Sequence, residues 1–163
     1  MSIPFNMDEV YEMAEQMERN GQAYYRRASE KVADSAPRKV LVDLAEMEAD
    51  HEKTFAAMRA ATAKQLKPPP SFDPYGEASQ YLHAFISGLV FDLDARPEDL
   101  LADCEDLQEI LRKAIGMERD SIAFYLGIKE MVPPEQGRDK IEDIVREEMG
   151  HVAMLSSRIK AMA

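Results

Sequence analysis

The sequence has 163 residues, 45% of them apolar and 31% charged, and its formal net charge is −11 at pH 7. This length and balance fit one soluble domain with a hydrophobic core, while the acidic charge argues against nucleic acid and anionic membranes as partners. The single cysteine, Cys104, excludes an intrachain disulfide framework and a Cys-x-x-Cys metal ribbon. With no signal-peptide pattern and no apolar run of membrane-spanning length, a cytoplasmic protein is expected.

Helical periodicity and turn sequences predict four long helices, at about 7–33, 37–64, 107–131 and 136–161. Asn6 with Glu9 three residues later is a capping-box pattern at the start of the first helix. The same spacing recurs with Asp106 and Glu109 before the third helix. Pro37 is predicted to occupy the first position of the second helix, where a missing N–H costs nothing.

The connection over 66–105 is too long for a hairpin turn between neighbouring helices. It contains a predicted short buried helix at about 77–91 and a further helical piece in "RPEDLLAD". His83 falls in this crossover, and we interpret it as a packing or surface residue. Four long helices with one long second-to-third connection predict an all-α, antiparallel four-helix bundle of the ferritin-like kind, in a single domain over 1–163.

The chain repeats itself with an offset of 100 residues. "MERNGQAYY" at 17–25 falls on "MERDSIAFY" at 117–125, and "LAEMEADHEKTF" at 44–55 falls on "IVREEMGHVAML" at 144–155. The register holds from the first helix cap through both Glu-x-x-His pairs without a gap. The sequence therefore predicts a duplicated αα-hairpin with a pseudo-twofold axis.

The repeat separates two classes among the many acidic residues. Some acidic positions fall on non-acidic residues one repeat away, and we expect them on the solvated surface: Glu15, Glu46, Asp50 and Glu52. Six residues keep their type in both halves: Glu18, Glu48, His51, Glu118, Glu148 and His151. Tyr25 and Tyr125 also match, seven residues after the first glutamate of each half.

The six repeated residues are expected to point into the bundle. Residues three apart share a helix face, so Glu48 and His51 lie together, on a face that also carries Leu44, Met47 and Phe55. Small residues one turn after the first glutamate of each half leave space for a ligand or water. Four buried carboxylates need a counter-charge, which two divalent cations would supply. The mixed oxygen and nitrogen donors favour iron or manganese, and a Glu from two helices with Glu-x-x-His from two others is the di-iron pattern of such bundles.

The motifs "MAEQMERNGQAYYRRAS", "LAEMEADHEKTF", "AIGMERDSIAFY" and "IVREEMGHVAML" resemble those of stand-alone, rubrerythrin-like (erythrin-type) members of the ferritin-like superfamily. The resemblance covers about 7–62 and 107–161. It implies a centre of two iron ions, for which manganese or zinc could substitute. Glu48 and Glu148 would bridge the metals, Glu18 and Glu118 would be terminal ligands, and His51 and His151 would each bind one ion.

The same resemblance implies a reaction and partners. Family members react ferrous iron with peroxide or dioxygen, and a homodimer is expected. Full-length rubrerythrins carry a four-cysteine rubredoxin domain; with only one cysteine here, electrons are expected from a separate donor such as rubredoxin. They also carry an additional helix glutamate, tied to peroxide selectivity, at a position that is Ser121 in this sequence.

Two other functions remain open from the sequence. One is ferroxidase and iron handling, as in ferritins, and the other is a non-catalytic metal-binding or protein-interaction bundle. Tyr25 and Tyr125 are interpreted either as core aromatics or as residues that hydrogen-bond the metal ligands.

Overall fold

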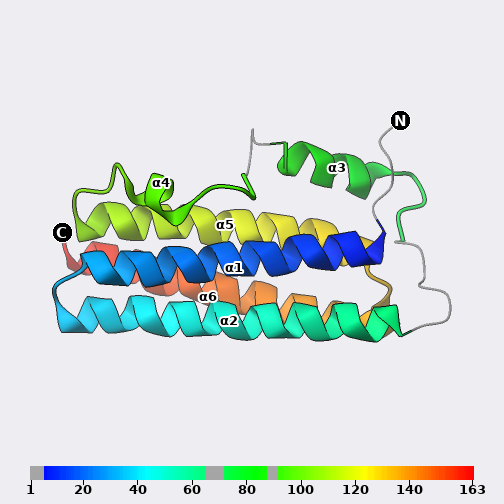
Figure 1. Ribbon diagram of the computed structural model, residues 1–163, viewed down its shortest axis with the longest axis horizontal. Coiled ribbons are helices and arrows are strands. Elements are labelled where there is room, and N and C mark those ends of the chain that lie inside the picture. Colours follow the sequence, from blue (N-terminus) through cyan, green and yellow to red (C-terminus); the bar gives the residue numbers. More distant parts are fainter. Residues whose placement is uncertain (1–5, 65–71, 88–91) are drawn as a thin grey trace.

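The computed structural model describes residues 6–64, 72–87 and 92–163. Four long helices lie side by side in it (Figure 1): α1 (Met7–Lys31), α2 (Ser35–Ala63), α5 (Leu107–Met131) and α6 (Arg138–Ala161). Each of the pairs α1–α2 and α5–α6 is an αα-hairpin with extensive internal contact. The prediction of an all-α four-helix bundle with one long crossover is therefore confirmed.

The helices begin where the capping signals predict, except for α2 and α6, whose first residues differ by two from the prediction. The Asn6 side chain accepts from the Glu9 N–H at 3.0 Å and the Glu9 carboxylate accepts from the Asn6 N–H at 2.9 Å, which completes the capping box. Pro37 is the third residue of α2, not the first as predicted, because the helix begins at Ser35. Proline is tolerated there because the first-turn N–H groups have no partner within the helix.

The start of α6, in contrast, was predicted two residues early, at 136. A short 3₁₀ helix, η1 (Pro134–Gln136), precedes it, and Gly137 at φ +98° turns the chain into the helix at Arg138. This left-handed backbone favours glycine, which has no Cβ to clash.

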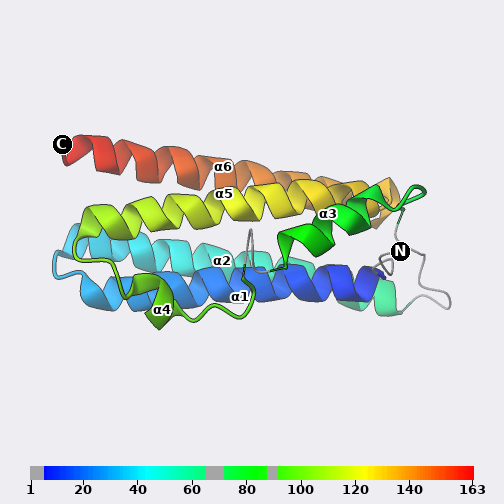
Figure 2. The same ribbon diagram turned by 90° about the horizontal axis from the view of Figure 1, so that it is seen from above.

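The crossover carries two short helices on one side of the bundle (Figure 2). Helix α3 (Glu77–Phe85) packs on α5, and α4 (Pro97–Leu101) packs on α1. The predicted helix over 77–91 thus ends at Phe85, and its last part, 88–91, lies outside the described residues. His83 is half-buried, as expected for a packing or surface residue.

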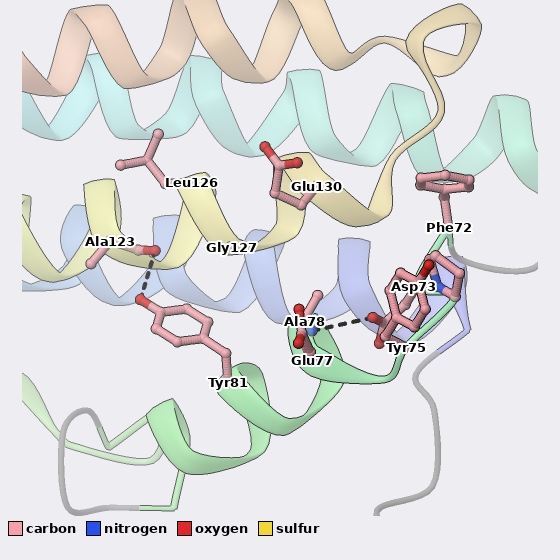
Figure 3. A pocket seen from close by; sticks show the side chains of 11 residues that line it. Phe72, Asp73, Tyr75, Glu77, Ala78, Tyr81, Ala123, Leu126, Gly127 and Glu130 are labelled. Atoms are coloured by element: carbon pink, nitrogen blue, oxygen red, sulfur yellow. Dashed lines mark hydrogen bonds between the residues drawn. The ribbon is translucent and has the colours of Figure 1, made fainter.

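Hydrogen bonds between side chains and backbone hold helix α3 at its start and at its middle (Figure 3). The Asp73 carboxylate accepts from the N–H of Ala78. It also accepts from the N–H of Ser79, so two first-turn donors of α3 are satisfied. The Tyr81 hydroxyl donates to the Ala123 carbonyl of α5 at 2.9 Å, and the ring lies over Gly127. A pocket of about 560 Å³ remains between α3 and α5, and none of its lining residues is one of the six repeated charged residues.

The apolar core is split into two clusters along the bundle. One contains the first part of α1 and the Phe55 end of α2, and the other contains the Tyr24 end of α1 and the Leu41 end of α2. In each long helix the repeated charged residues fall between the two clusters. Met47, expected on the inner face of α2, is instead 37% exposed. No described helix is long and apolar enough to span a membrane.

Candidate metal centre

All six repeated charged residues are buried in the middle of the bundle. Each of the four long helices contributes, and none of the six is more than 5% exposed: Glu18, Glu48, His51, Glu118, Glu148 and His151. Most of the chain's other acidic residues lie at its surface; Glu15 is the other buried carboxylate, and arginines pair with it.

The six side chains form two overlapping groups of four. One consists of Glu18, Glu48, His51 and Glu148, and the other of Glu48, Glu118, Glu148 and His151. Within each group one donor atom per residue lies within 4.8 Å of all the others. Glu48 and Glu148 belong to both groups, so their two carboxylates lie between the two candidate metal positions.

Both imidazoles present the same ring nitrogen to the carboxylates. His51 Nδ1 lies 3.1 Å from Glu148 Oε1 and 3.4 Å from Glu18 Oε2. In the other half, His151 Nδ1 lies 2.8 Å from Glu148 Oε2 and 3.4 Å from Glu118 Oε2. The two rings are nearly parallel, at an interplanar angle of 22°, with centroids 6.1 Å apart. The contacts of each histidine with the first glutamate of its own half, both at 3.4 Å, follow the pseudo-twofold relation predicted from the repeat. Glu148 departs from it, because Nδ1 of both histidines lies closest to this one glutamate.

Many of the atoms that face the centre lack a hydrogen-bond partner among the described residues. They are Glu18 Oε2, His51 Nδ1, Glu118 Oε2, His151 Nδ1 and both carboxylate oxygens of Glu148. Buried polar atoms are normally satisfied, and a convergent set without partners is typical of a site that takes a ligand. Oxygen and imidazole donors at these distances fit divalent cations.

The electrostatics of the cluster show how strongly it favours positive charge. Burial, with the neighbouring Glu18, raises the pKa of Glu48 well above its usual range, and burial likewise raises that of Glu118. Burial alone would lower the pKa of His151, but the carboxylates of Glu118 and Glu148 beside its Nδ1 raise it to about 10. Burial would raise the pKa of Glu148, yet the two imidazoles beside its carboxylate bring it below its usual value. Protons thus take the place of cations in the metal-free cluster.

Tyr25 and Tyr125 contact this cluster from opposite hairpins. The Tyr25 hydroxyl donates to Glu118 Oε1, and the Tyr125 hydroxyl donates to Glu18 Oε1. Burial, and then the charges of these glutamates, raise the pKa of both phenols well above the ordinary value, so they stay neutral donors. Each tyrosine therefore fixes one carboxylate oxygen of the other half and leaves the second oxygen facing the centre.

A small cavity of about 10 Å³ reaches the centre between α1 and α5. Gly21 and Ser121, the small residues one turn after Glu18 and Glu118, both line it. A Cβ on Gly21 would lie 3.0 Å from the Glu48 carboxylate, so glycine leaves room for the placement of Glu48. The volume is close to that needed for one water-sized molecule.

One surface expectation was wrong and one contact was missed. Glu15 is buried rather than solvated, because Arg19 and Arg59 each lie 3.5 Å from its carboxylate. Of the other acidic residues expected at the surface, Glu46 and Asp50 are exposed, and Glu52 is half-buried beside Arg19. Glu147, which the sequence did not single out, lies 2.9 Å from His51 Nε2. Its position, in register with Met47, gave no repeat signal.

Comparison with known proteins identifies the fold. No family model and no curated protein sequence matches the chain. A solved structure from Thermotoga maritima, provisionally described as a ferritin-like diiron-carboxylate protein, aligns with a TM-score of 0.66 and 20% identity over 98% of both chains. A hypothetical protein from Pyrococcus furiosus aligns with a TM-score of 0.65 and 18% identity, over 96% of this chain and 89% of its own. The fold is the ferritin-like four-helix bundle.

Proposed function

We propose that this protein is a ferritin-like di-iron carboxylate protein. The observation that carries the proposal is the pair of four-residue groups that share Glu48 and Glu148. Four carboxylates balance the charge of two divalent cations, and their oxygen donors with two imidazoles suit iron or manganese. The description of the Thermotoga maritima structure supports iron. Manganese or zinc could occupy the same donor set.

Each residue has a distinct role in this proposal. Glu48 and Glu148, common to both groups, would bridge the two ions. Glu18 and His51 would complete one site, and Glu118 and His151 the other. Tyr25 and Tyr125 would act as positioning residues, because their hydroxyls hold Glu118 and Glu18.

We further propose an oxidoreductase of the rubrerythrin type. When bound, two ferrous ions supply two electrons for the reduction of peroxide or dioxygen. The cavity lined by Gly21 and Ser121 has room for about one water-sized molecule, which favours a small oxidant over a larger organic substrate. Reducing equivalents would come from an electron donor such as rubredoxin, because Cys104 alone cannot form a rubredoxin site within these 163 residues.

The test is anaerobic loading with Fe(II), followed by stopped-flow mixing with peroxide or with dioxygen. We expect about two irons per chain, faster oxidation by peroxide, and turnover when reduced rubredoxin is added. Glu48→Gln combined with Glu148→Gln should abolish iron binding. Glu46→Gln is the matched control, because Glu46 lies exposed on the same helix as Glu48.

The opposite outcomes would point to other functions. Much faster oxidation by dioxygen, with turnover of excess Fe(II) and assembly into a large cage by light scattering, would indicate iron handling of the ferritin type. Binding of metal without oxidation by either reagent would indicate a non-catalytic bundle.

A further inference from the structure

The carboxylate of Glu147 reaches the outer edge of one imidazole. Glu147 lies on α6 and its side chain is 54% exposed, yet it is 2.9 Å from Nε2 of the buried His51 on α2. Since an ionised carboxylate only accepts, the His51 Nε2–H donates to it. Glu147 and His51 both line an open cleft of about 640 Å³ together with residues of α2 and α6.

The other half of the repeat lacks this contact. The offset of 100 places Met47 in register with Glu147, and a thioether is only a weak acceptor. His151 Nε2 is buried, and no described residue offers it a hydrogen-bond partner. The two imidazoles are therefore alike on the side that faces the carboxylates and different on the side that faces outward.

The outward contact affects the inward nitrogen. A hydrogen bond from Nε2–H fixes the proton on that nitrogen, so Nδ1, where the carboxylates converge, is the nitrogen whose lone pair would bind a metal. A carboxylate acceptor also makes the imidazole more basic towards a metal, and loss of such a partner typically costs 10–100-fold in metal affinity. His151 gains neither effect in the structure.

We infer that Glu147 is a positioning residue that makes the two metal positions inequivalent, so that the position of Glu18 and His51 fills first and binds more tightly. This inference rests on the proposed two-metal centre and adds an order of loading to it. Because Glu48 and Glu148 are common to both positions, the difference between the positions comes from the outward partner of each histidine.

The test is a calorimetric titration of the metal-free protein with Co(II), which fits the same donors and needs no oxidant. The wild type should bind two ions in two resolved steps. Glu147→Met should weaken the tighter step by about 10–100-fold and leave the weaker step nearly unchanged. Met47→Glu should strengthen the weaker step, and the double exchange should again show two resolved steps.

The substitutions should be compatible with the fold, because each introduces the residue that the other half of the repeat has at the equivalent position: methionine at 47 and glutamate at 147. Circular dichroism should show unchanged helix content. Glu147→Gln, which can still accept through its amide oxygen, should weaken the tighter step less than Glu147→Met. Two resolved steps in the wild type that Glu147→Met leaves unaltered would overturn the inference but not the proposed function. No binding of Co(II) by the wild type would overturn both.

Discussion

The chemistry of the centre begins with the balance of charge among single residues. Four carboxylates and two imidazoles share a buried volume, and the metal-free chain meets this by holding protons. Burial keeps Glu48 and Glu118 protonated above their ordinary pKa, whereas the two histidines keep Glu148 ionised. A cation that binds here must displace these protons, so metal affinity should rise with pH.

The same pKa shifts predict how stability depends on pH. The pKa of His151 is raised from 6.5 to about 10, so its stabilising contribution is complete below pH 6.5 and is lost as pH rises to about 10. The raised pKa of Glu48 acts with the same sign, since the folded state holds more protons than the unfolded state. The melting temperature of the metal-free protein should therefore fall across this window in calorimetric scans. The metal-loaded protein, with the same surface charges, is the control and should change less. A metal-free melting temperature that stays constant or rises would contradict the argument.

Removal of one tyrosine hydroxyl tests the contacts that hold the glutamates. Tyr125→Phe leaves Glu18 Oε1 buried without its donor, and we expect a loss of about 1–3 kcal/mol in the free energy of unfolding of the metal-free protein. Urea unfolding followed by circular dichroism would measure it. Tyr75→Phe is the matched control, because Tyr75 is 83% exposed and should be silent. Equal effects of the two substitutions would show that the hydroxyl of Tyr125 holds nothing.

At the scale of elements, helix α3 of the crossover packs on α5 where Tyr81 lies against Gly127. A Cβ on Gly127 would lie 2.6 Å from the Tyr81 ring, which is tethered by its hydroxyl to Ala123. Gly116, on the same helix, has nothing within 4 Å of its Cβ position. The two glycines thus differ in packing but not in helical context.

Alanine at these two positions should have different effects. Gly116→Ala should stabilise the protein by up to about 1 kcal/mol through helix propensity. Gly127→Ala should lose that gain, because the Tyr81 ring must move and α3 with it. Urea unfolding of both variants would measure the difference. In a protein that already carries Tyr81→Ala, Gly127→Ala should again stabilise the folded state by the helix-propensity gain. Equal stabilisation by the two single substitutions would contradict the close contact.

The long helices were predictable because local signals mark them. The caps at Asn6 and Asp106 gave the starts of α1 and α5 to the residue. The length of α3 was not predictable, because its sequence continues to look helical beyond Phe85. The burial of Glu15 likewise depends on Arg59, which lies 44 residues away in the sequence, so no local pattern marks it.

At the scale of the whole molecule, the repeat made the candidate site readable. Glu18, Glu48 and His51 were distinguishable from other polar residues only because each recurs 100 residues later. The same method could not find Glu147, whose function depends on its not being repeated. Symmetry thus identifies what the two halves share, and the structure is needed for what distinguishes them.

The six buried charged residues lie between the two apolar clusters, so a metal bound to them should affect the stability of the whole bundle. Free metal at about 100 times its dissociation constant should stabilise the folded state by about 2.7 kcal/mol, which corresponds to roughly 5–10 °C in melting temperature. A chelator should reverse the shift.

Glu48→Gln gives the sharpest form of this prediction. It removes a shared carboxylate, so the stabilisation by metal should largely disappear. It also replaces a buried acid whose pKa is raised by burial and by Glu18, so the metal-free variant should be at least as stable as the metal-free wild type. Differential scanning calorimetry with and without metal measures both effects, with Glu46→Gln as the exposed control on α2. If Glu48→Gln destabilised the metal-free protein and kept the full shift with metal, Glu48 would be a structural residue rather than a shared ligand.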